Sequence, residues 1–182
     1  KAILIRINSP GGSTGATQEI AEEMDKIRSS KKPIVISMGD MCASAGYWLA
    51  SKGNYIFASP ATMTGSIGVY IQHMNIAKML AEWGIEVEFV KNGKFKTSGN
   101  AYESLSKDDR AYLQAMVDER ADEFFAAVAE FRGVEESVVK GTDARVMRPS
   151  EALSLGLIDA AESPTTAVAS FVAELGNAAD EP

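Results

Sequence analysis

The stretch Gly39-Asp-Met-Cys-Ala-Ser-Ala-Gly-Tyr-Trp-Leu49 places a serine, Ser44, where a buried strand gives way to a helix. Residues 33–38 form a short apolar run typical of a buried strand, and residues 43–51 begin a helix with small residues around one hydroxyl. At the first turn of a helix, unpaired N–H groups and the positive dipole end favour developing negative charge. Ser44 is therefore either an N-cap, a common position for serine, or a nucleophile with room beside it for a substrate backbone.

Strand and helix patterns alternate along the whole chain. A strand pattern over residues 1–7 is followed by the glycine turn Gly11-Gly12 and an amphipathic helix over residues 17–29. Further strands are predicted over residues 55–58, 64–71, 85–90 and 157–159, and further helices over residues 75–83, 107–132, 135–140, 149–155 and 164–175. This alternation predicts an α/β fold with a largely parallel sheet and right-handed crossovers.

Composition fits one soluble domain. The 182 residues are 46% hydrophobic, which is enough for a real core, and 18 basic against 25 acidic residues leave a net charge of −7 without a basic patch for nucleic acid. A single cysteine, Cys42, excludes an internal disulfide. We expect a catalytic domain over residues 1–160, with residues 161–182 as its C-terminal helix and acidic tail. The chain enters a strand at once without a methionine, so we expect a fragment of a longer protein.

Few residues offer catalytic chemistry. His73 is the only histidine, and no aspartate is placed to orient it, so we favour a structural or surface role over a Ser-His-Asp triad. No HExxH motif or cysteine pair indicates a metal site, and no cofactor is expected. Asp40 is the only acid close to the glycine turns, which leaves paired-carboxylate chemistry with little support. The catalytic chemistry that remains is a serine nucleophile with a lysine as its base.

Three lysines, Lys91, Lys94 and Lys96, lie in a polar, glycine-bearing loop. Lysines in a loop usually form a solvated surface, but a lysine becomes a base when its amine loses its proton. No acid immediately flanks Lys96, and in an extended segment Lys94 points to the opposite side. Among the three, Lys96 is therefore the candidate base.

With these residues in place, the chain resembles the signal peptide peptidase A family of serine-lysine endopeptidases, which have the Clp-protease/crotonase fold of repeated β-β-α units. The resemblance covers nearly all 182 residues. It is carried by five blocks in the family's order: Asn8-Ser-Pro-Gly-Gly12, Met41-Cys-Ala-Ser-Ala-Gly-Tyr47, Thr64-Gly-Ser-Ile-Gly-Val69, Gly93-Lys-Phe-Lys96 and Arg148-Pro-Ser-Glu-Ala-Leu-Ser-Leu-Gly-Leu-Ile-Asp159.

The resemblance implies roles for four residues. Ser44 matches the nucleophile, Lys96 the general base, Gly11 an oxyanion-hole amide, and Ser66 the hydroxyl that positions the lysine. It also implies hydrophobic peptide substrates such as remnant signal peptides, and a homo-oligomer with sites near subunit interfaces. Family members are membrane-anchored, so a catalytic domain outside the cytoplasm is expected if an upstream anchor exists. The family's anchor and first strands are absent from this sequence.

Three alternatives stay open at this point. Phage capsid-maturation proteases share the serine-lysine motif and lack an anchor. Crotonase-type acyl-CoA enzymes share the fold but use oxyanion amides with acidic residues. A non-catalytic assembly scaffold on the same fold would need none of this chemistry.

Overall fold

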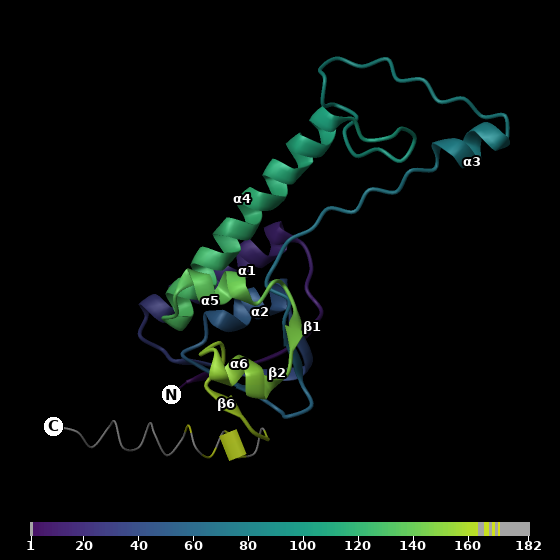
Figure 1. Ribbon diagram of the computed structural model, residues 1–182. Helices are drawn as coiled ribbons and strands as arrows, with labels where there is room; N and C mark the ends of the chain where they lie inside the picture. Colours follow the sequence, from purple (N-terminus) through teal and green to yellow (C-terminus); the bar gives the residue numbers. More distant parts are fainter. Residues whose placement is uncertain (1, 164–165, 168, 170, 172–182) are drawn as a thin grey trace. The chain divides into compact units, whose positions relative to one another are not determined.

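A computed structural model describes residues 2–163, 166, 167, 169 and 171 (Figure 1). The chain divides into two compact units. We call Lys1–Gly68 together with Glu123–Pro182 the sheet unit, and Val69–Asp122 the lysine unit. Helix α4 (Lys107–Arg132) begins in the lysine unit and ends in the sheet unit. The domain boundary expected at residue 160 stays a prediction.

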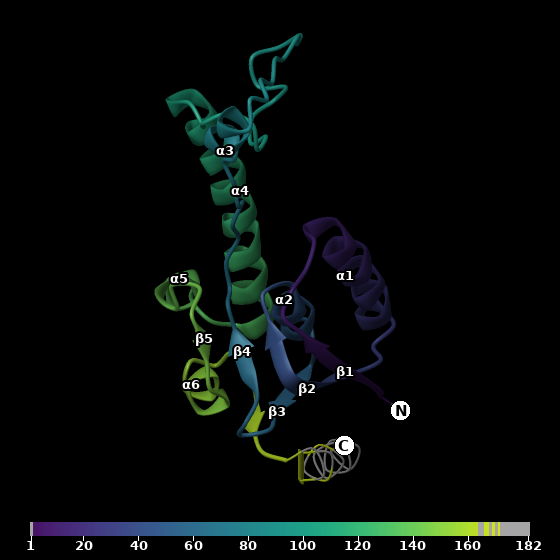
Figure 2. The ribbon, with the colours of Figure 1, turned by 90° about the vertical axis from the view of Figure 1, so that its right-hand side faces the viewer.

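The sheet is built around β2 (Ile34–Ala43), most of which is buried. Parallel β1 (Ile3–Ser9) pairs along one edge of β2, and parallel β3 (Tyr55–Ala58) and β4 (Met63–Gly65) share the other edge (Figure 2). The short β6 (Ala160–Ala161) is parallel to β3, whereas β5 (Val146–Met147) is antiparallel to β4. Strands buried on both faces have continuous apolar sequences, as residues 33–38 do. The predicted α/β class with a largely parallel sheet is confirmed.

Helices of the sheet unit complete its core: α1 (Thr14–Ser29), α2 (Ala45–Ser51), α5 (Glu136–Gly141) and α6 (Pro149–Ser154). The ring of Trp48 on α2 stacks on Phe124 of α4 with 4.6 Å between centroids. Beside it, the buried Tyr47 hydroxyl donates a 2.6 Å hydrogen bond to the Leu157 carbonyl. These contacts hold α2 against the C-terminal part of the chain.

The end of α2 away from Ser44 is fixed by Lys52. Its Nζ lies 2.7 Å from both carboxylate oxygens of Asp25 and 4.1 Å from the centroid of the Phe131 ring. The Arg28 guanidinium also donates to the Lys52 carbonyl. Only 6% of the Lys52 side chain is exposed, so its charge is buried with a partner, as a buried charge requires. The helix that follows Ser44 is thereby held at both ends.

The lysine unit contains α3 (Ala77–Glu82), the loop that carries Lys91, Lys94 and Lys96, and the first part of α4. Asn75 Oδ1 accepts the Ala77 N–H at 2.9 Å, just before α3. A capping box begins α4: Asp109 N–H donates to Ser106 Oγ at 3.1 Å, and Ser106 N–H donates to Asp109 Oδ2 at 3.2 Å. No helix among the described residues is both long and apolar enough to cross a bilayer.

Three predicted strands differ from the structure. Residues 85–90 form no strand. Their alternating pattern gives the segment an apolar and a polar face, but a strand also needs a neighbouring strand to pair with, which the pattern does not determine. The strand predicted over residues 64–71 ends at Gly65, since Ser66 has a φ of 51°. The last strand is β6 rather than residues 157–159. Just before it, Asp159 N–H donates to the Ile56 carbonyl at 2.8 Å, and Ile56 N–H donates to Asp159 Oδ2 at 2.7 Å. The helix predicted over residues 164–175 lies mostly outside the described residues.

Candidate active site

Ser44 occupies a strained turn between β2 and α2. Its φ of 52° and ψ of −126° lie in a region that residues other than glycine rarely adopt, at a cost of about 1–3 kcal/mol. Two backbone hydrogen bonds hold this conformation: Ser44 N–H donates to the Gly65 carbonyl at 2.9 Å, and Trp48 N–H donates to the Ser44 carbonyl at 3.0 Å. Such strain persists only where the surroundings over-determine the backbone, and it is frequent at active sites.

The Ser44 hydroxyl is not used as a helix cap. An N-cap oxygen accepts a hydrogen bond from the second or third amide of its helix, and the Ser44 side chain makes no such bond. The residue is half-buried. Ser44 thus occupies the N-cap position of α2 without capping the helix through its side chain.

Gly11 lies directly against the Ser44 side chain. A Cβ atom added to Gly11 would lie 2.8 Å from Ser44 Cβ and 3.1 Å from Ser44 Oγ, closer than packed atoms allow. The φ of Gly11 is +127°, which also disfavours any side chain. By contrast, a Cβ added to Gly12 would meet nothing within 4 Å. The first glycine of the pair is thus the one that the turn requires.

The Gly11 amide already has a partner, which the sequence did not indicate. Gly11 N–H donates to Ser9 Oγ at 3.2 Å, the long end of the hydrogen-bond range. The Ser9 side chain also packs close to Gly46 on α2, since a Cβ on Gly46 would lie 3.2 Å from Ser9 Cβ. A negatively charged oxygen is a stronger acceptor than a neutral hydroxyl, so an oxyanion would compete well for this amide.

A bulge brings the end of β1 to Ser44. Ile7 pairs with Met38 but Ser9 pairs with Cys42, so β2 contains two extra residues at this point. The Asn8 side chain accepts the Met41 N–H at 3.1 Å within the bulge. We did not predict this bulge, because strand register depends on pairing and leaves no local signal at Asn8.

Ser66 immediately follows Gly65, whose carbonyl accepts the Ser44 N–H. Ser66 N–H donates to the Arg145 carbonyl at 2.9 Å, and the φ values of Ser66 and Gly65 are 51° and 88°. Strand β5, which begins at the next residue, pairs with β4. The structure thus brings Ser44, Gly11 and Ser66 together in the sheet unit. Arg145 was missed because it acts through its carbonyl, which any residue could supply.

Lys96, the fourth predicted residue, lies in the lysine unit and is exposed. The two other lysines of this loop each have a side-chain partner: Lys91 donates to Thr97 Oγ1 at 2.6 Å, and Lys94 forms an ion pair with Asp108. For Lys96, no ion pair is found within the described part of the chain. The role of Lys96 as a base stays a prediction.

Two other candidate groups are unsuited to nucleophilic or triad chemistry. Cys42 is fully buried, and this burial raises the pKa of its thiol to about 12, so almost no thiolate exists at neutral pH. Both ring nitrogens of His73 are shielded from solvent and find no hydrogen-bond partner among the residues described here. Within the same residues, no group of three or more His, Cys, Asp or Glu side chains is placed to hold a metal ion.

Residues 26–177 match the model of peptidase family S49. The chain belongs to this family. The matched segment includes Ser44, Ser66 and Lys96, whereas Gly11 precedes it. Membership of S49 confirms the resemblance drawn from the five sequence blocks.

Relatives from cells and from a phage are similar to this S49 chain. It is 35% identical to Protease 4 of Salmonella typhi over 87% of the chain and 26% of that protein. It is 33% identical to the putative signal peptide peptidase SppA of Enterococcus faecium over 87% of the chain and 46% of that protein. With capsid assembly protease C of Escherichia phage lambda, the identity is 32% over 91% of the chain and 38% of that protein. The chain thus spans about a quarter to a half of these relatives.

The Gly11 contact predicts a large effect from a single methyl group. In Gly11→Ala, the new Cβ must displace either Ser44 or the turn, so we expect the rate at which a fluorophosphonate probe labels Ser44 to fall about a hundredfold. The rate is measured by intact-protein mass spectrometry, and circular dichroism checks that the variant is folded. Gly12→Ala is the matched control and should label at nearly the normal rate, because its added Cβ meets no neighbour. An unchanged labelling rate in folded Gly11→Ala would show that another residue donates to the oxyanion.

Proposed function

We propose that this chain is the catalytic segment of a serine endopeptidase in which Ser44 is the nucleophile and Lys96 the general base. The observation that carries the proposal is the strained turn of Ser44, with an uncapped hydroxyl facing Gly11. Membership of peptidase family S49 supports the same reaction class. A scaffold without catalysis would have no need to hold a serine in this conformation.

The reaction proceeds through an acyl-enzyme. Neutral Lys96 takes the proton from Ser44 Oγ as this oxygen attacks the carbonyl carbon of the scissile peptide bond. The C–N bond then breaks, and the Lys96 ammonium returns its proton to the departing amine nitrogen. Water attacks the ester, Lys96 accepts the water proton, and Ser44 leaves with its hydroxyl restored.

Gly11 and Ser66 have supporting roles in this proposal. The Gly11 N–H leaves Ser9 Oγ and donates to the oxyanion that forms when Ser44 attacks. The Ser66 hydroxyl holds the Lys96 amine toward Ser44. The backbone link from Gly65 to Ser44 supports this second role, because it keeps Ser66 within a short distance of the nucleophile.

The substrates that we propose are hydrophobic peptides such as remnant signal peptides. The name of the Enterococcus faecium relative supports this class. The similarity to capsid assembly protease C supports the alternative, maturation of a phage capsid by the same chemistry. We also propose membrane attachment if an upstream anchor exists, as the resemblance implies.

Association into a homo-oligomer completes the proposal. The only buried residues of α4 are Phe124 and Val128, and Tyr112 and Met116 on the same helix are 42% and 44% exposed. Tyr112 stacks on Phe95 with 4.7 Å between ring centroids, so Met116 is the large apolar side chain of α4 that we propose contacts another copy. Light scattering tests this point, and a monomer at working concentration would contradict it.

Replacing Ser44 tests the enzyme directly. Ser44→Ala removes one oxygen from a site of small residues, so we expect an intact fold and complete loss of peptide hydrolysis. The assay follows cleavage of a fluorogenic hydrophobic peptide and of a signal peptide. Substantial hydrolysis by a clean Ser44→Ala preparation would refute the assignment of the nucleophile.

Replacing Lys96 tests the base. Lys96→Met removes the amine and keeps much of the side-chain shape, so we expect turnover to fall by roughly a hundredfold or more. Lys94→Met and His73→Gln are the controls and should retain most of the activity. Normal turnover of Lys96→Met between pH 6 and 10, together with an inactive His73→Gln, would exclude the serine-lysine mechanism.

A further inference from the structure

Residues 85–90, Ile-Glu-Val-Glu-Phe-Val, form an unpaired run of backbone that we call the acidic segment. Ile85 N–H donates to the Leu80 carbonyl at 2.9 Å. From Glu86 to Lys91, the described part of the chain contains no backbone–backbone hydrogen bond. A run of free N–H and C=O groups can pair with another chain, as the edge of a sheet does.

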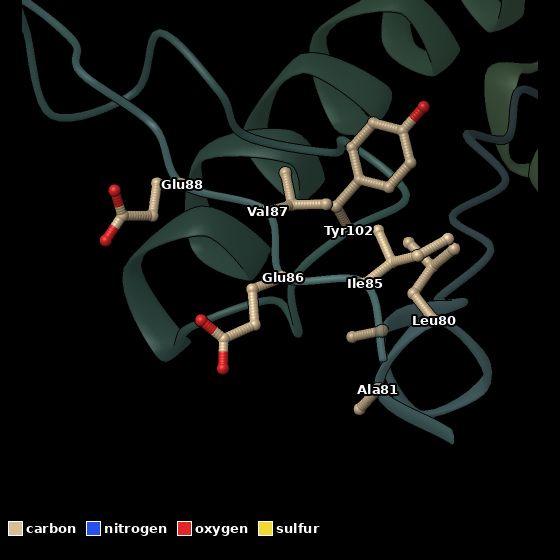
Figure 3. A pocket seen from close by; sticks show the side chains of 8 residues that line it. Leu80, Ala81, Ile85, Glu86, Val87, Glu88 and Tyr102 are labelled. Atoms are coloured by element: carbon tan, nitrogen blue, oxygen red, sulfur yellow. The ribbon is translucent and has the colours of Figure 1, made fainter. Parts of the chain in front are cut away.

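The two faces of the acidic segment differ in chemistry. Ile85 and Val87 lie on the side of Leu80 and Tyr102, and the carboxylates of Glu86 and Glu88 point away from them (Figure 3). Phe89 continues the apolar face, with its ring centroid 6.4 Å from that of Tyr102. Neither glutamate forms an ion pair with any residue that the structure describes.

The acidic segment borders a hollow of about 320 Å³ within the lysine unit, and Glu86 and Glu88 line this hollow together with its apolar residues. Its apolar wall comes from Leu80 and Ala81 near the end of α3 and from the Tyr102 ring (Figure 3). Ile85 and Val87 are 48% and 42% exposed, so apolar surface remains open beside the hollow. Its volume is at the lower end of the range for ligand pockets, and its apolar wall offers a contact for one apolar side chain.

We propose that the acidic segment binds an extended peptide with alternating apolar and basic residues, which adds to it as a β-strand. The free backbone calls for a strand as partner, since main-chain hydrogen bonds provide the affinity in strand addition. The apolar residues of the peptide lie on the face of Val87 and the hollow. Its Lys or Arg residues lie opposite Glu86 and Glu88, where opposite charges on neighbouring strands attract.

Charge complementarity selects this peptide over other strands. An acidic strand would place carboxylates beside Glu86 and Glu88, and like charges directly opposite each other are destabilising. A purely apolar strand would leave both glutamates without partners. The proposal goes beyond the proposed function, because the docking of a peptide here requires no chemistry at Ser44.

Binding is measured with the full chain carrying Ser44→Ala, so that no peptide is cleaved. The probe is a fluorescent, acetylated and amidated hexapeptide, Val-Lys-Val-Lys-Val-Lys, followed by fluorescence anisotropy. Controls are Val-Glu-Val-Glu-Val-Glu and the block peptide Val-Val-Val-Lys-Lys-Lys, which has the same composition as the probe. We expect the alternating basic peptide to bind at least tenfold more tightly than either control, and methylation of its amides along one edge to abolish binding.

The paired substitution Glu86→Gln with Glu88→Gln removes both charges and keeps the side-chain shape. We expect it to weaken binding about three- to tenfold and to reduce the salt dependence of binding. Glu119→Gln on α4 is the matched control and should bind normally. Equal binding of the three peptides, or no effect of the paired substitution, would overturn the proposal. So would an absence of peptide binding together with self-association that the paired substitution abolishes, which would assign the segment to a second copy of the chain.

Discussion

The hydrogen bond from the Ser44 amide to the Gly65 carbonyl, 2.9 Å long, is the contact on which the candidate site depends. It continues the parallel pairing of β2 with β4 by one residue and ends it at the point where Ser44 turns into α2. On the other side of β2, the bulge at Asn8 brings Gly11 against the Ser44 side chain. The strain at Ser44 is thus sustained by strands on both edges of β2.

The fold class could be predicted because it depends on local patterns. Apolar runs marked the buried strands, and the capping box of Ser106 and Asp109 marked the start of α4. The failures have a different cause. Residues 85–90 have the alternation of a strand, but a strand also needs a partner, and pairing is a property of the whole fold. The same limit hid the bulge at Asn8.

The candidate site divides in a similar way. The position of Ser44 between a strand pattern and a helix pattern left it open between an N-cap and a nucleophile, and the resemblance to the family suggested the second; in the structure its side chain makes no cap hydrogen bond. Ser9 and Arg145 were not identified, because Ser9 acts through a hydroxyl on a neighbouring amide and Arg145 through its carbonyl. Neither interaction leaves a recognisable residue pattern. The roles of Ser44, Lys96, Gly11 and Ser66 stay predictions.

The central claim is that Ser44 is held ready to attack, with the Gly11 amide beside it for the oxyanion. The most direct measurement is a high-resolution crystal structure of the chain after reaction with a fluorophosphonate. We predict phosphorus bonded to Ser44 Oγ, with a phosphonyl oxygen accepting the Gly11 N–H in place of Ser9 Oγ. Phosphonylation of another residue, or a phosphonyl oxygen directed away from Gly11, would contradict the account.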